Sequence, residues 1–363
     1  MELQENRLER AWAILTSLTQ AHGPKAEICI LQGAVLAKSG QYERALRCYE
    51  ESLALAPNDS QAMVGAAVCL HMLGHIPQAL RYYRSALERQ CAEPLVALES
   101  RKTRLFDSAA AEQVLWEVLE QLADAGVHAF ATAGTLLGLE REGRLLPFDK
   151  DLDIGVPYHE IQTARDLLLQ SGWQLAVAPR GMINPIMLHN GRGLALDLCG
   201  FMADPESGAT LGGFWLSDAP TDWQRVTWYP VLHLDKQPSA AGRMVWAVTN
   251  PQAWLAALYG PSWRVPDADF DTVIAAHNLR GFALLTQCYA FSRIYNSWIQ
   301  GQLKKAASLV QHAVRHMPND TLLLAVQQCL ARQKNQTRLQ GEPRRRRGRL
   351  SPAHYRGKER ARE

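Results

Sequence analysis

A period of 34 residues constrains the fold of this chain most strongly. Ala11, Ala45 and Ala79 are each separated by 34 positions. Repeats of this length are typical of antiparallel helix pairs that stack into an array, where small residues allow the helix axes to approach closely. The unit beginning at residue 26 carries small, aromatic and helix-ending residues at Gly33, Gly40, Ala45, Tyr49 and Pro57, and the next unit at Ala67, Gly74, Ala79, Tyr83 and Ala86. We therefore expect an all-α domain at residues 1–104.

These spacings resemble the tetratricopeptide repeat family, with two near-complete units and a half unit before them. The resemblance implies a protein partner for the repeats; the alternative is that the helical ends only cap another domain. Near the C-terminus, the spacings of Gly40, Ala45, Ser52 and Pro57 recur at Gly301, Ala306, Ala313 and Pro318. Because any amphipathic helix pair gives some such matches, residues 281–335 are expected to be helical, beginning with a helix at Phe282–Trp298, and whether they form a repeat is left open.

The pattern changes between the helical ends. A helix is expected at residues 109–122, with a cap at Asp107 or Ser108 and a stop at Gly126. Apolar segments predict strands at 128–132, 152–156, 173–177, 186–188 and 194–198, and Asn190-Gly191 indicates a type I′ hairpin. Helices mixed with strands predict an α/β or α+β domain at residues 105–280.

Charge is distributed unevenly along the chain. The net charge is +3, but residues 343–363 hold nine Lys/Arg against two Glu, so the preceding part is mildly acidic. We expect residues 336–363 to form a disordered basic tail and no nucleic acid to bind, because a nucleic-acid-binding face spreads its basic residues over folded surface. The N-terminus lacks the apolar core of an export signal, and the seven scattered cysteines form no CxxC pair. A cytoplasmic protein with at most peripheral contact with the inner face of a membrane is expected.

Three segments carry candidate chemistry. The first, AGTLLG at residues 133–138, follows a predicted strand and opens a helix. Gly134 and Thr135 there would bind phosphate oxygens through the free N–H groups of the helix start and a hydroxyl. The second contains Asp151 and Asp153, which point to the same face of a strand because their spacing is two. The third contains Asp197, the one charged residue in an otherwise apolar strand.

Carboxylates on one face repel each other unless a cation neutralises them, and carboxylate oxygens suit Mg²⁺ or Mn²⁺. The alternatives are a solvated acidic turn for Asp151 and Asp153 and an ion pair with Arg192 for Asp197. The apolar residues between the carboxylates favour a partly buried metal site held by Asp151, Asp153 and Asp197. A carboxylate pair beside a small-residue helix start, with a third carboxylate on a later strand, is typical of the nucleotidyltransferase fold.

The segments GTLLGLEREGRLLPFDKDLDIGV (134–156) and LAALYGPSWRVPDADFD (255–271) resemble the LicD/fukutin family, which includes fukutin-related protein. The resemblance covers about residues 109–273. It implies transfer of a phospho-alcohol, such as phosphocholine or ribitol phosphate, from a CDP-activated donor to a glycan. It also implies substrate-binding roles for Arg141 and Asp149. Lys150 departs from the acidic residue that many members carry, which puts the preferred donor in doubt.

In the second motif, Arg264 is a candidate for holding a phosphate; alternatively, it pairs with Asp267 or Asp271. Taken together, the sequence predicts a Mg²⁺- or Mn²⁺-dependent phosphotransferase in which Asp151, Asp153 and Asp197 are catalytic. Two other functions remain open: a nucleotidyltransferase that modifies a protein or small molecule, and a non-catalytic tetratricopeptide scaffold.

Overall fold

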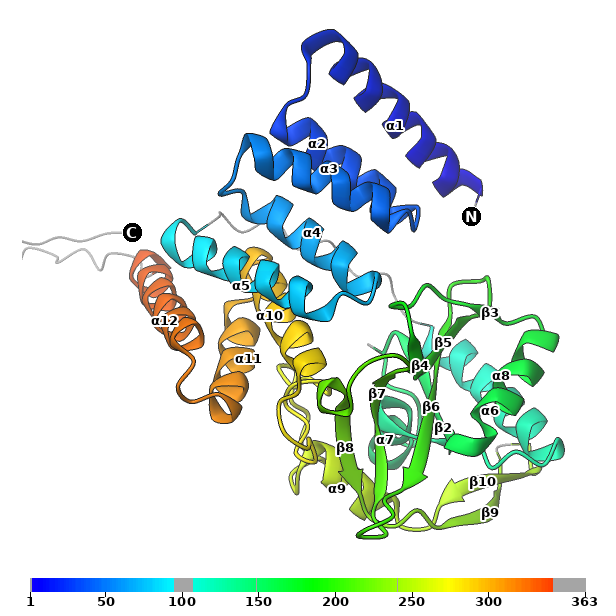
Figure 1. Ribbon diagram of the computed structural model, residues 1–363. Coiled ribbons are helices and arrows are strands. Elements are labelled where there is room, and N and C mark those ends of the chain that lie inside the picture. The colour runs from blue at the N-terminus through cyan, green and yellow to red at the C-terminus, as the bar shows by residue number, and fades with distance from the viewer. Residues whose placement is uncertain (1, 95–106, 148, 240, 342–363) are drawn as a thin grey trace, which may run out of the picture.

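The computed structural model describes residues 2–94, 107–147, 149–239 and 241–341. The N-terminal part is a helical array of α1 (Glu2–His22), α2 (Ala26–Lys38), α3 (Tyr42–Leu55), α4 (Ser60–Met72) and α5 (Ile76–Ala92) (Figure 1). Two glycines at the helix turns, Gly40 and Gly74, have positive φ values of 73° and 81°. The Tyr49 ring packs so closely on its neighbours that an added Cβ would lie 2.8 Å from it at Gly33 and 2.2 Å from it at Gly65. The small residues of the 34-residue period therefore mark real close contacts.

The C-terminal helices α10 (Leu284–Ile299), α11 (Leu303–His316) and α12 (Thr321–Gly341) lie against this array. Helix α10 packs on α5, and both belong to one apolar core (Figure 1). The Tyr295 hydroxyl donates to Ser60 Oγ at 3.1 Å, and Arg84 pairs with Asp320 at 2.7 Å. Gly301 has a positive φ of 72°, like the turn glycines Gly40 and Gly74. The array thus continues in space across about 190 intervening residues of chain.

The intervening residues form a mixed domain around a sheet that has eight strands within the described part of the chain. Its strands are β1 (Phe130–Ala131), β2 (Asp151–Pro157), β3 (Gln174–Leu175), β4 (Met182–Asn184), β5 (Ile186–His189), β6 (Ala195–Ala203), β7 (Thr210–Leu216) and β8 (Arg225–Tyr229). The central order is β1-β2-β6-β5-β3, and β7 pairs with β4, β6 and β8. Strands β2 and β6 are parallel, and β9 (Leu234–Pro238) pairs with β10 (Met244–Val248) in a separate hairpin.

Helices cover the sheet: α6 (Ser108–Asp124), α7 (Ala133–Glu142), α8 (Ile161–Gln170) and α9 (Pro251–Tyr259), with short 3₁₀ turns at Tyr158–Glu160 and Thr221–Trp223. Leu152 and Ile154 of β2 are fully buried in a core that α6 and α8 share. Because side chains alternate along a strand, Asp151 and Asp153 belong to the opposite face, where α7 and α9 enclose a second core. The expected combination of a mixed helix-and-sheet domain with an all-α repeat region is confirmed.

Some local expectations were wrong. Strand β5 pairs with β6 through His189 and Ala195, so the connection has five residues and is not a two-residue type I′ turn. The Asn190 side chain instead accepts hydrogen bonds from the N–H groups of Arg192 and Leu194. Helix α12 continues to Gly341, into the segment expected to be a disordered tail; the rest of that segment, 342–363, and the expected domain boundary at 104/105 lie outside the described residues. No helix in the described ranges is long and apolar enough to span a bilayer.

Candidate active site

The three predicted carboxylates lie together on β2 and β6. Asp153 and Asp197 are direct partners in the parallel register of these strands, and Asp151 is opposite Ala195 two residues earlier. All three side chains line one cavity and are half-buried. The proximity of Asp197 to Asp151 and Asp153, which the sequence could not establish, follows from this register.

The start of α7 fixes the orientation of Asp153. The Gly134 N–H donates to Asp153 Oδ2 at 2.8 Å, and the Asp153 N–H donates to Thr135 Oγ1 at 2.8 Å. An added Cβ at Gly134 would lie 3.1 Å from Asp153 Oδ2 and 3.4 Å from Asp149 Oδ1. Thr135 is fully buried and is not among the residues that line the cavity. The expected contact of the Thr135 hydroxyl with phosphate therefore does not fit, because that hydroxyl supports the backbone of Asp153.

Electrostatic repulsion is strong among these acids. Burial, followed by repulsion from the neighbouring Asp151, raises the pKa of Asp197 to about 7. Burial also raises the pKa of Asp153 well above its ordinary value, with added repulsion from Asp151 and Asp197. The pKa of Asp151 is raised by burial too, although the exposed Lys150 opposes the shift. The ionised cluster is unfavourable by itself and would be stabilised by positive charge.

Asp149 and Arg141 extend the cluster. Burial, and then repulsion from Asp151, raises the pKa of Asp149 to about 6, while Arg141 opposes the shift. Asp149 Oδ2 is buried and has no hydrogen-bond partner in the described structure. A free carboxylate oxygen beside repelling carboxylates fits a hard divalent cation. No ready-made group of three metal-binding side chains is found within the described residues, so a cation would take its remaining ligands from water and substrate phosphate, as Mg²⁺ commonly does.

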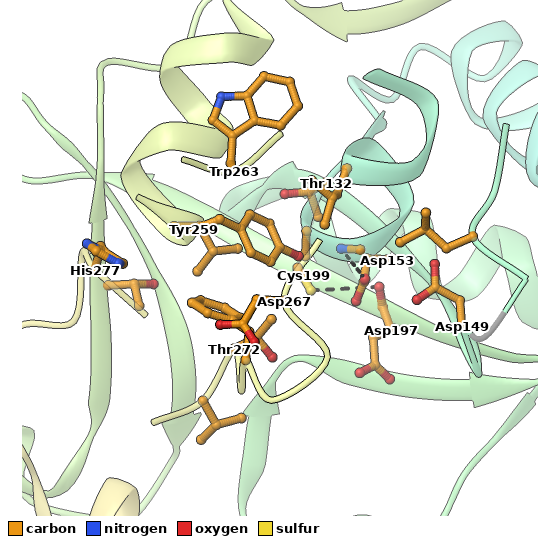
Figure 2. Close-up of a pocket in the computed structure, with 18 of the residues that line it drawn as sticks. Thr132, Asp149, Asp153, Asp197, Cys199, Tyr259, Trp263, Asp267, Thr272 and His277 are labelled. Carbon is orange, nitrogen blue, oxygen red and sulfur yellow. Dashed lines mark hydrogen bonds between the residues drawn. The ribbon is translucent and has the colours of Figure 1, made fainter. Parts of the chain in front are cut away.

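The carboxylates form one end of a cavity of about 920 Å³. Asp149, Asp153 and Asp197 lie on one side of it and His277 on the other, with Tyr259 between them (Figure 2). Burial raises the pKa of Tyr259 well above its ordinary value, and Asp153 raises it further. Tyr259 therefore keeps its proton and can donate a hydrogen bond into the cavity.

Arg264 is not among the cavity residues. Its guanidinium lies 4.1 Å from the centre of the Trp263 ring and is exposed, whereas Trp263 is buried and lines the cavity. The alternative pairing of Arg264 with Asp271 is also not seen, because the Asp271 carboxylate pairs with Arg293 at 2.5 Å. The structure therefore gives no support to the expectation that Arg264 binds phosphate in this cavity.

Sequence reasoning identified Arg141, which lines the cavity, but missed its other basic residues, which are Arg225, His277, Arg293 and His312. Arg225 is an isolated cation in the apolar strand β8, the same signal that singled out Asp197 in β6. Arg293 and His312 come from α10 and α11, and no sequence pattern connects these helices with the carboxylates.

Comparison with known proteins agrees with this geometry. Residues 126–223 match the family model LicD/FKTN/FKRP, nucleotidyltransferase domain. Residues 27–92 match a tetratricopeptide repeat model. The resemblance to the LicD/fukutin family with N-terminal tetratricopeptide repeats is thus confirmed. The LicD match includes Gly134 and all four acidic residues of the cluster, and it ends before Arg225 and α9.

More distant relatives were also found. The uncharacterized protein T07A5.1 of Caenorhabditis elegans is 26% identical over 222 residues, which cover 58% of each protein. The chain therefore spans less than two thirds of that relative's length. Among solved structures, the lincosamide antibiotic adenylyltransferase LnuA is 16% identical, covering 38% of this chain and 80% of that one with a TM-score of 0.27. The antibiotic-resistance factor ANT(2″)-Ia is 13% identical, covering 57% and 98%, with a TM-score of 0.29.

Proposed function

We propose that this chain moves a phospho-alcohol from a CDP-activated donor to a hydroxyl of a glycan in a Mg²⁺-dependent reaction. The LicD match indicates the broader class, a transferase of the phosphotransferase or nucleotidyltransferase type. The observation that carries the proposal is the adjacency of Asp153 and Asp197 on paired strands, facing one cavity beside the start of α7. Choline, ribitol and glycerol phosphates are the donor groups that we consider.

The scheme gives parts to three of the four acids and to Gly134. Asp151 and Asp153 would hold Mg²⁺, which would neutralise the donor diphosphate, and Gly134 leaves the space that this approach requires. The pKa of about 7 for Asp197 suits a general base. Asp197 would accept the proton of the acceptor hydroxyl while the hydroxyl oxygen of the acceptor forms a bond to the phosphorus of the phospho-alcohol. The bond from that phosphorus to CMP breaks, and the products are a phosphodiester and CMP.

The test is CMP release from CDP-choline, CDP-ribitol and CDP-glycerol, each with Mg²⁺ or with EDTA. We expect one donor to give Mg²⁺-dependent release that falls at least about 100-fold in Asp153→Asn. Asp166→Asn is the matched control, because Asp166 is an exposed carboxylate on α8 that pairs with Arg165 outside the cavity. Full activity of Asp153→Asn would refute the scheme. Covalent labelling of a product by the nucleotide would assign a nucleotidyltransferase instead, and Mg²⁺–CDP binding without turnover of any donor would favour a scaffold.

A further inference from the structure

The cavity also has a basic part, which we call the basic end, and helices outside the mixed domain supply some of it. This part is lined by Arg225 of β8, Arg293 of α10 and His312 of α11. His277 also lines the cavity and lies across Tyr259 from the carboxylates (Figure 2). Helices α10 and α11 therefore form a wall of the cavity in addition to packing against the repeat array.

Arg225 is a buried cation whose hydrogen-bond partners within the described residues are two backbone carbonyl groups. Its side chain is 4% exposed, and it donates to the oxygens of Val273 at 3.0 Å and Thr272 at 2.7 Å. The Phe214 ring lies 4.8 Å from its guanidinium carbon. Burial lowers the pKa of Arg225 to about 10, so the group stays charged at neutral pH. A buried charge of this kind is costly unless an anion compensates it.

One buried carboxylate, Asp271, faces both arginines of this end. Its Oδ2 accepts a hydrogen bond from Arg293 at 2.5 Å, and its Oδ1 accepts the N–H groups of Val273 and Ile274. Asp271 thus directly pairs with Arg293 and acts on Arg225 only at longer range. Asp267 also lines the cavity, but it is exposed and its Oδ1 accepts the N–H of Asp269. Two guanidinium groups with one buried carboxylate leave a net positive charge at this end.

The basic end and the carboxylates line the same cavity, so one bound complex can contact both. The Cys199 thiol of β6 lies near both groups: Asp153 and Asp197 raise its pKa beyond the effect of burial, whereas Arg225 lowers it. A CDP-linked donor has its diphosphate at the carboxylate end in the scheme above. A second anionic group, held at the basic end, must then belong to the other substrate.

We propose that Arg225 and Arg293 bind an anionic group of the acceptor, so that the acceptor is a phosphate- or carboxylate-bearing sugar positioned partly by helix α10. The identification of this ligand as the acceptor rests on the proposed function, whereas binding of the anionic group can be measured without turnover. Guanidinium groups bind both oxyanions through charge-assisted hydrogen bonds. His277 and His312 provide further polar contacts on the same wall.

The experiment measures binding to the full chain by calorimetry, with glucose, glucose 6-phosphate and glucuronic acid as probes and Mg²⁺–CDP as a separate ligand. We expect at least one charged sugar to bind at least about tenfold more tightly than glucose, and the stronger of the two identifies the anion. Arg293→Gln should weaken that binding about tenfold or more and leave Mg²⁺–CDP affinity unchanged. Arg81→Gln, an exposed arginine of α5 outside the cavity, should change neither.

Arg293 also pairs with Asp271, so Arg293→Gln could disturb the fold as well as ligand binding. Two further variants keep the test decisive in that case. Arg293→Lys keeps the charge and should retain most of the charged-sugar affinity, and His312→Gln leaves the Asp271 pair intact and should weaken the binding by a smaller factor. Equal binding of glucose and both charged sugars would overturn the proposal, as would unchanged binding in folded Arg293→Gln. Weaker Mg²⁺–CDP binding in Arg293→Gln would assign the basic end to the donor. Failure of the proposed function alone would leave Arg293-dependent sugar binding in place while CMP release is absent.

Discussion

Replacing Asp197 by Asn should make the metal-free protein more stable at neutral and higher pH, although it removes a proposed catalytic group. The substitution is nearly isosteric and removes one charge from a cluster in which burial, followed by Asp151, raises the pKa of Asp197 from 3.8 to about 7. A pKa that is raised in the folded state means that ionisation costs folding free energy. The folded wild-type protein therefore bears a cost that the Asn variant avoids.

The magnitude follows from the shift. Three pKa units at about 1.4 kcal/mol each give about 4 kcal/mol as an upper bound, and screening by water reduces this to about 2 kcal/mol for a half-buried group. The stabilising contribution of the neutral Asp197 carboxyl group is fully present below its unfolded pKa of about 4 and is lost as pH rises through its folded pKa of about 7. The difference between variant and wild type should be small at pH 4.5 and complete at pH 8.

The assay is thermal unfolding of both proteins in EDTA at pH 4.5, 6 and 8, repeated at pH 8 with Mg²⁺. At pH 8 in EDTA, the Asn variant should unfold several degrees higher than the wild type. Mg²⁺ should raise the wild-type midpoint more than that of the variant, because the cation replaces the missing positive charge. A variant that is less stable in EDTA at pH 8, or a difference that does not change with pH, would refute the reasoning about the cluster.

Two more predictions test the supports of the site and of the repeats. Thr135→Val should lower the free energy of unfolding by about 1–3 kcal/mol, because it leaves the Asp153 N–H without an acceptor. The same variant should weaken Mg²⁺ binding measured by calorimetry. Thr135→Ser keeps the hydroxyl and should retain most of the Mg²⁺ affinity. Gly65→Ala should lower the thermal midpoint, because its Cβ would lie 2.2 Å from the Tyr49 ring, and should leave Mg²⁺ affinity unchanged; weaker Mg²⁺ binding would show that the first repeats support the cavity.

Local patterns allowed much of the fold to be predicted. The helix at α6 was predicted from its cap, and the Asp107 side chain indeed accepts the N–H of Ala110. Strand β2 was predicted from its alternation of acidic and apolar residues, which also placed Asp151 and Asp153 on one face. Strands β4, β7, β8, β9 and β10 were not predicted. Among them, β7 contains two adjacent glycines and β9 is polar and mostly exposed. Such segments form strands through their pairing partners, which a local window does not contain.

The site was only partly predictable for the same reason. Candidate carboxylates can be identified one strand at a time, but the pairing of Asp153 with Asp197 is a register between distant segments. The direction of the Thr135 hydroxyl depends on the backbone of β2, so no local pattern favours the Asp153 N–H over a phosphate as its partner. The position of Arg293 in the cavity depends on the packing of α10 against α5, and the complete fold determines this packing.

The packing of α10 against α5 limits how far the protein can be shortened. A fragment that stops after α9 would keep every residue of the LicD match and would still lose part of the enclosure, because Arg293 and His312 follow later in the chain. It would also uncover the apolar surface of α5 that α10 shields. The minimal unit that retains the complete cavity therefore needs α10 and α11, and also α4 and α5, against which α10 packs. Removing helices from either end of that unit would take away support for the cavity in its middle.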